Sequence, residues 1–197
     1  MPYLNISPIV ISVASTEGET IEDFIKKRIE DVATVGKTFW HIHSQNEEVP
    51  IYIHRFCSIG IPKHELSSIL YCYFILGSEH KIKPTTHGFE VATRYSSNLI
   101  DWNPLPPELN DVRGRSIKPG AYALVFDQII KPEHEYLDLW DYADFFKNEP
   151  VKITKSHTTI CAKKSDGVQT FATMKLNDRK IIARGRLVSP YCVYLDK

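Results

Sequence analysis

The chain has 197 residues, of which 43% are hydrophobic and 24% charged, with 24 basic and 24 acidic side chains. This composition is ordinary for a globular protein and argues against disorder. The charge is unevenly divided, because residues 151–197 hold ten Lys or Arg against three Asp or Glu, whereas residues 1–150 hold fourteen against twenty-one. Such a division predicts either a surface that faces a negative partner or two halves that neutralise each other.

The sequence contains indications of the cellular compartment in its apolar runs, its first residues and the spacing of its cysteines. No apolar run approaches the roughly 20 residues that a membrane-spanning helix needs, and the first residues lack the basic start of a secretory signal. The four cysteines are scattered and form no CxxC pair, which disfavours a zinc ribbon or a thioredoxin-type site: Cys57, Cys72, Cys161 and Cys192. We therefore expect a soluble, cytoplasmic protein with buried thiols and no membrane segment.

The N-terminal part predicts a strand followed by a helix. Residues 8–14 form a short apolar run typical of a buried strand. Apolar residues then recur at helical spacing between positions 21 and 32, with charged residues on the other face, which predicts an amphipathic helix packed on a sheet. Thr16 with Glu19 fits a capping box before this helix, and Gly36 fits a left-handed turn at its end.

Strand composition continues through the middle of the chain, at residues 38–44, 49–56, 68–76, 89–95 and 121–130. Residues 68–76 are apolar on both faces, which predicts a central strand in which aromatic residues such as Tyr71 and Tyr73 fit core positions. Residues 96–119 are rich in proline and show little periodicity. They predict a long loop of the kind that is often functional.

The C-terminal third predicts a helix and then more strands. Residues 133–149 have one apolar and one acidic face, which predicts a second amphipathic helix that ends at Pro150. Residues 157–164, 168–176 and 180–188 have strand composition and are separated by turn signals, which predicts a β-meander with a last short strand at 191–195.

The expected fold class is therefore α+β: a mostly antiparallel, barrel-like sheet with two amphipathic helices and a C-terminal β-meander. We expect a single domain over residues 1–197. The alternative is a subdivision into a mixed α/β core, 1–132, and an acidic helix plus basic meander, 133–197.

Basic side chains follow the predicted meander and its turns, where they could contact phosphates: Lys163, Lys164, Lys175, Arg179, Lys180, Arg184 and Arg186. The 96–119 loop adds Arg113, Arg115 and Trp102, whose ring could stack on an unpaired base. The alternative is structural: lysines at edges and turns protect a sheet from aggregation, and the neighbouring acidic helix could cancel the field.

A second candidate site is a histidine pair. His41 and His43 would share one face of a strand, and imidazole suits zinc, iron or nickel. With Glu47 they form an HxHxxxE stretch, and His87 follows later. This pattern resembles the cupins, in which such residues hold a metal inside a barrel, and the resemblance covers about a quarter of the chain. It implies a divalent transition metal on His41, His43, Glu47 and His87. The glycine-rich turns typical of the family are missing, and an exposed polar strand face is the alternative.

Three functions remain open at this point. The leading hypothesis is a non-catalytic recognition module without a cofactor, comparable in architecture to PUA-like modules, that binds nucleic acid or an acidic protein surface through the basic C-terminal sheet and the long loop. The first alternative is a metal-dependent, cupin-like enzyme. The second is a protein–protein interaction or structural protein. The chain has no complete phosphate-binding loop and no GxSxG motif, so the sequence decides neither for nor against catalysis.

Overall fold

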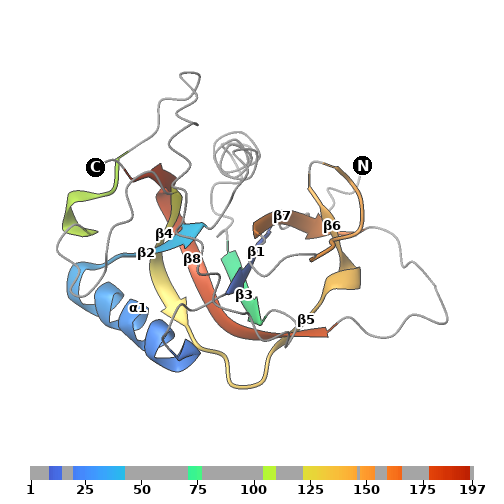
Figure 1. The fold of residues 1–197 in the computed structure, drawn as a ribbon, viewed down its shortest axis with the longest axis horizontal. Helices are drawn as coiled ribbons and strands as arrows, with labels where there is room; N and C mark the ends of the chain where they lie inside the picture. Colours follow the sequence, from blue (N-terminus) through green and yellow to red (C-terminus); the bar gives the residue numbers. More distant parts are fainter. Residues whose placement is uncertain are drawn as a thin grey trace, which may run out of the picture.

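The computed structural model describes residues 9–14, 20–42, 71–76, 104–109, 122–145, 147–153, 159–165 and 178–195. Figure 1 shows the elements of these ranges. They are β1 (Ile9–Ala14), α1 (Ile21–Val35), β2 (Thr38–Ile42), β3 (Tyr71–Leu76), η1 (Pro107–Leu109), β4 (Tyr122–Ile130), β5 (Tyr136–Asp138), η2 (Leu139–Asp141), β6 (Tyr142–Asp144), β7 (Thr159–Lys164) and β8 (Asp178–Tyr194). The predicted strands at 49–56 and 89–95 lie outside the described residues.

One sheet contains all the described strands, in the order β2-β4-β8-β3-β1-β7-β6, with β5 paired to β8 beside this path. Only the pair β1–β3 is parallel among the described strands, and the others are antiparallel. The α+β class with a mostly antiparallel sheet is therefore confirmed. The position of β3 between β8 and β1 also confirms that residues 68–76 contain a central strand.

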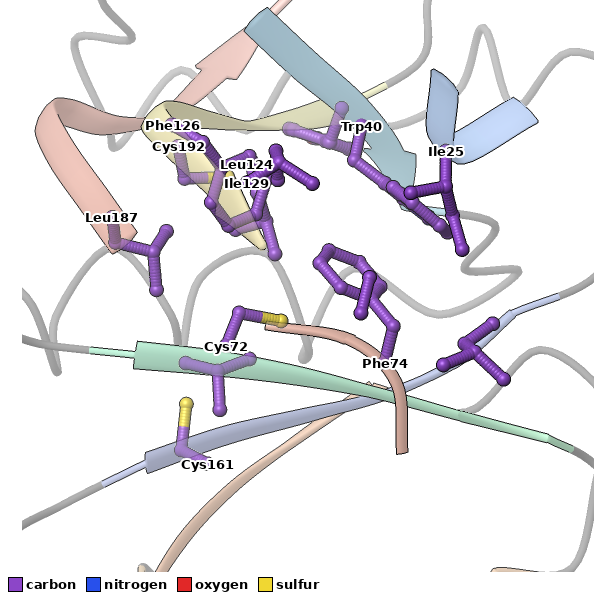
Figure 2. Packing of buried hydrophobic residues seen from close by; sticks show 14 residues of the cluster. Ile25, Trp40, Cys72, Phe74, Leu124, Phe126, Ile129, Cys161, Leu187 and Cys192 are labelled. Carbon is purple, nitrogen blue, oxygen red and sulfur yellow. The ribbon is translucent and has the colours of Figure 1, made fainter. Parts of the chain in front are cut away.

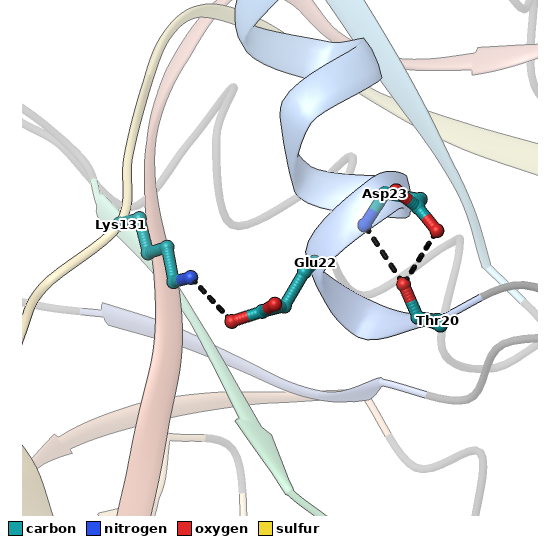
Figure 3. Close-up of polar contacts among 4 residues, drawn as sticks. All are labelled: Thr20, Glu22, Asp23 and Lys131. Carbon is teal, nitrogen blue, oxygen red and sulfur yellow. Dashed lines mark hydrogen bonds and ion pairs between the residues drawn. The ribbon is translucent and has the colours of Figure 1, made fainter.

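The helix α1 begins after Thr20, one turn later than the predicted capping box at residues 16–19, which lies outside the described part. The Thr20 hydroxyl accepts a hydrogen bond from the Asp23 backbone N–H at 3.1 Å and donates one to Asp23 Oδ2 at 2.7 Å (Figure 3). This is the capping that Ser and Thr provide at helix starts. The helix ends at Gly36, whose φ of 77° confirms the predicted left-handed turn.

An exposed ion pair joins the first turn of α1 to the end of β4. Figure 3 shows Lys131, just past β4, directed at Glu22 on the helix, with Nζ and Oε1 2.8 Å apart. The hydrogen bond and charge of Lys131 hold the pKa of Glu22 below its ordinary value. The helix itself packs on β4 and β2, as the amphipathic pattern predicted.

The sheet is curved, so that side chains of distant strands meet in its concave core. Trp40 on β2 stacks on Phe74 of β3 with ring centroids 3.7 Å apart, although β4 and β8 lie between these strands in the sheet. Phe126 of β4 meets Phe74 edge-on, and Phe24 of α1 meets Trp40 edge-on. Figure 2 shows Phe74 and Cys72 facing the side chains of β2 and β4 across this core. Over the described strands the sheet is unclosed, so the expected barrel is not confirmed.

The second predicted helix is wrong, because residues 136–144 form β5, η2 and β6 instead. Leu137 and Leu139 are buried while Tyr136 is 61% exposed, which matches the two-residue period of an extended chain. β5 pairs with the start of β8 and β6 pairs with β7, so these strands supply the hydrogen-bond partners. The Asp138 carboxylate also accepts from the Trp140 backbone N–H at 2.9 Å, a local bond that competes with helix formation.

The predicted meander is also wrong, since β7 and β8 are separated in the sheet by β1 and β3. Residues 168–176, its expected middle strand, lie outside the described part. The expected strands at 180–188 and 191–195 are one strand, β8, with an interruption: Leu124 pairs with Cys192, whereas Phe126 pairs with Leu187. Additional residues of β8 therefore bulge out between these two pairs.

Two expectations from composition can be compared with the structure. Cys72, Cys161 and Cys192 are buried, as predicted, and Cys57 lies outside the described residues. Within the described part of the chain, no helix has the length and apolar character needed to cross a membrane.

Candidate functional site

The centre of β8 places two arginines on one face and a glycine on the other, because successive side chains of a strand alternate. A Cβ at Gly185 would lie 2.6 Å from Cδ1 of Phe126 and 3.0 Å from Cδ1 of Ile129. Only glycine therefore lets these two β4 side chains pack against the backbone of β8. This packing fixes the face of the strand on which Arg184 and Arg186 lie.

Two tyrosines of β3 lie beside these arginines. Tyr71 pairs in register with Arg186, and Tyr73 pairs with Arg184, so the four side chains share one face of the sheet. All four are half-buried. The guanidinium carbon of Arg184 lies 5.5 Å from the centroid of the Tyr71 ring, a cation–π distance. We call the surface formed by Tyr71, Tyr73, Arg184 and Arg186 the Arg–Tyr face.

Arg186 has a tightly bound carboxylate partner. Its Nε donates to Asp127 Oδ1 at 2.7 Å and its Nη2 donates to Oδ2 at 3.1 Å, which is a bidentate pair. Asp127 is placed for this by a β-bulge, because the register between β4 and β8 shifts between Phe126 and Gln128. The hydrogen bond and charge of Asp127 raise the pKa of Arg186, which remains charged at all relevant pH values.

Arg184 has a looser carboxylate partner. Its Nη1 lies 3.8 Å from Oε2 of Glu135, and the two side chains are 31% and 46% exposed. Burial raises the pKa of the nearby Tyr73 phenol, and the Glu135 charge adds to this, whereas the charge and hydrogen bond of Arg184 lower it. Arg184, Tyr73 and Glu135 therefore form one interacting group, in which the phenol is protonated at neutral pH.

The other basic residues of β7 and β8 have no ion partner in the described part of the chain. No described carboxylate oxygen lies within 4.0 Å of the side-chain nitrogens of Lys163, Lys164, Arg179 or Lys180. Lys163 instead places Nζ 5.9 Å from the centroid of the Phe145 ring. These cations lie on β7 and β8, the two strands that pair with the acidic segment, and alternation along β7 puts Lys163 on the face of Cys161, opposite to the Arg–Tyr face.

That acidic segment, residues 133–149, lies beside the basic strands even though it is not a helix. β5 pairs Tyr136 with Lys180, and β6 pairs Ala143 with Lys163. The segment is thus adjacent to the basic strands in the sheet, while cancellation of their positive field stays a prediction. The carboxylates that contact Arg184 and Arg186 are nevertheless Glu135 and Asp127, and Asp127 lies on β4, outside this segment.

The loop residues of the predicted site, Trp102, Arg113 and Arg115, lie outside the described residues, as does Lys175. Their part in binding stays a prediction. The described piece of that loop, residues 104–109, contains η1 and places Leu109 in the core.

The predicted metal ligands are described only at His41. Its ring meets Phe39 edge-on, with centroids 5.3 Å apart, and Trp40 points to the other side of β2 into the core, as alternation predicts. His43, Glu47 and His87 lie outside the described residues. Within the described ranges, no three His, Cys, Asp or Glu side chains are grouped as a metal site would require.

Sequence reasoning missed the two tyrosines and the two carboxylates of the face. Tyr71 and Tyr73 were expected in the core; Tyr73 does pack against a core cluster, yet both tyrosines are also partly exposed beside the arginines. The two-residue spacing shared by Tyr71–Tyr73 and Arg184–Arg186 was the available signal. Asp127 and Glu135 could be assigned only once the strand register and the bulge were known.

The chain was compared with models of protein families, with curated proteins and with solved structures, and none of the three comparisons gave a match. The chemistry of the Arg–Tyr face is therefore the basis for interpretation. A guanidinium has five N–H donors, and the bidentate pair of Arg186 uses Nε and Nη2 only. The face can thus donate further hydrogen bonds to an oxyanion while its tyrosine rings provide apolar contact area.

Proposed function

We propose that the protein is a non-catalytic recognition module that binds a negatively charged partner through the Arg–Tyr face. The observation that carries the proposal is the pairing of two arginines with two tyrosines on one partly exposed sheet face, above the Gly185 packing that holds β8 in place. Arginine and tyrosine are the residue types that dominate binding energy at protein interfaces. A sheet also holds such side chains more rigidly than a loop does.

Between the two partner classes, an acidic protein surface fits better than nucleic acid. Surfaces that bind nucleic acid carry a large positive excess, whereas Arg184 and Arg186 are balanced here by Glu135 and Asp127. The acidic segment 133–149 runs beside the same strands and would repel a dense row of phosphates. Isolated carboxylates on a protein have lower charge density and can approach the arginines individually.

The other cations of β7 and β8 then act at longer range. Lys163, Lys164 and Lys180 have no ion partner among the described residues, so they add to the long-range positive field of β7 and β8 that attracts an acidic partner. Such steering is screened by salt over a distance of about 10 Å at 0.1 M. Binding is therefore expected to weaken as salt is added.

The test compares three labelled probes of similar length: a peptide of about 20 residues with glutamate at every third position, a single-stranded oligonucleotide and a DNA duplex. We expect the peptide to bind in the micromolar to millimolar range, and to bind several-fold more weakly when salt rises from about 50 to about 200 mM. Absence of binding to all three probes at low salt would contradict the proposed function. Tighter binding of either nucleic acid would replace the acidic protein by nucleic acid as partner.

A matched pair of variants locates the site. The double variant Arg184→Gln, Arg186→Gln should lower the peptide affinity by about tenfold, since each lost guanidinium removes charge-assisted hydrogen bonds. Lys26→Gln with Lys27→Gln removes the same charge from α1 and should change affinity by less than about twofold. Equal losses in both double variants would show that net charge, and not the Arg–Tyr face, determines binding.

A further inference from the structure

We propose that Glu135 is an internal competitor that occupies Arg184 until a partner carboxylate displaces it, whereas Asp127 is a positioning residue that holds Arg186 ready to bind. The inference rests on the proposed function and names how the face is regulated. It predicts that two substitutions with the same change of charge, one at each carboxylate, act in opposite directions on affinity.

The Glu135 carboxylate is free to leave without disturbing the fold. Its contact with Arg184 is long, at 3.8 Å, and its side chain is 46% exposed, so the pair is worth little in water. The backbone at this position is held independently, because the Ile181 N–H donates to the Glu135 carbonyl oxygen at 2.9 Å. A partner carboxylate can therefore replace the side chain while β5 stays paired with β8.

Arg184 keeps its position when Glu135 leaves. Its guanidinium carbon lies 5.5 Å from the centroid of the Tyr71 ring, and its charge lowers the pKa of the Tyr73 phenol beside it. Both tyrosines come from β3, on the side of β8 away from β4. The arginine is thus supported by groups that a ligand does not displace, and less rotamer entropy is lost when it binds an oxyanion.

Asp127 differs from Glu135 in every respect that matters for displacement. Its two oxygens accept from Arg186 Nε at 2.7 Å and from Nη2 at 3.1 Å, and its side chain is only 28% exposed. An incoming carboxylate would have to break both bonds to take its place. The bidentate pair instead fixes the plane of the guanidinium and leaves the Nη1 hydrogens for a ligand.

The experiment measures the affinity of the glutamate-bearing peptide for the full chain and for three variants, each of which removes one negative charge. Glu135→Gln should raise the affinity by about two- to fivefold, because a competitor is removed. Asp127→Asn should lower it by about two- to fivefold, because Arg186 loses its fixed orientation. Glu133→Gln, an exposed change in the same segment, is the control and should alter the affinity by less than about 1.5-fold.

The outcomes separate this inference from the proposed function. If wild type binds the peptide and both Glu135→Gln and Asp127→Asn raise its affinity equally, simple electrostatics explains the data and the inference is wrong. If Glu135→Gln leaves the affinity unchanged, Glu135 is no competitor and the inference is also wrong, while the proposed function stands. If only Glu135→Gln binds, the inference is supported in its strongest form. If no variant and no wild-type protein binds any probe, both proposals fall.

Discussion

The two faces of β8 differ in what determines their residues. On the core face, Ala183 pairs with Phe74 and Gly185 lies against Phe126, so the size of each side chain is set by close packing. On the other face, Arg184 and Arg186 are half-buried and are held by hydrogen bonds and charges that could be rearranged. The contrast is confined to the centre of the strand, because further along the Arg–Tyr side Ile181 packs with Ile75 in a second core. It teaches that a strand buried on both faces can still carry a short polar stretch whose contacts are open to exchange.

Truncation in the core should produce the largest effect. Phe74 is fully buried, stacks on Trp40 and meets Phe126 edge-on. Phe74→Ala should therefore lower the free energy of unfolding by about 3–5 kcal/mol, measured by urea denaturation. Tyr71→Phe, on the other face of the same strand, should change it by less than about 1 kcal/mol. Similar losses at the two positions would remove the distinction between the faces.

A methyl group at Gly185 should have the next largest effect. Gly185→Ala places a Cβ within 2.6 Å of the Phe126 ring, and we expect a loss of about 1–3 kcal/mol from overpacking. Combining it with Phe126→Leu, which removes ring atoms near the new methyl, should cost less than the sum of the two single changes. Strict additivity in this double-mutant cycle would mean that the contact does not limit the packing of β8.

On the Arg–Tyr face, the effects should appear in a phenol pKa. Because Arg184 lowers the pKa of Tyr73 and Glu135 raises it, Arg184→Gln should raise this pKa and Glu135→Gln should lower it. The carbon NMR signal of the tyrosine ring, followed at alkaline pH, gives both values. The same direction of change in both variants would show that the three side chains do not interact as described.

Patterns within short stretches of sequence correctly predicted the elements that such stretches determine by themselves. The helical spacing between residues 21 and 32 and the glycine at position 36 gave α1, and the apolar runs gave β1 and β3. The helix predicted for residues 133–149 was wrong because the structure of this segment depends on strands far along the chain. β8 and β7 supply the backbone hydrogen-bond partners for β5 and β6. The predicted β-meander was wrong for a related reason. Strands that are neighbours in the sequence need not be neighbours in the sheet, and β1 and β3 lie between β7 and β8.

The candidate site was predictable only in part. The basic residues of β7 and β8 follow from composition, and their strands could be placed from periodicity. Their counterions could not, because Asp127 lies 59 positions before Arg186 in the sequence and faces it only through a bulge. A one-residue change of register would direct these side chains to other partners.

The most direct test of the central claim is to map the peptide's contact surface on the protein by NMR. The glutamate-bearing peptide is titrated into labelled protein, and the shifts of backbone amides and arginine Nε–H groups are followed. We predict that the largest shifts occur at residues 71–73 and 184–186, with the Nε–H signals of Arg184 and Arg186 among them. Binding that shifts other regions and leaves these residues unchanged would contradict the assignment of the Arg–Tyr face as the recognition surface.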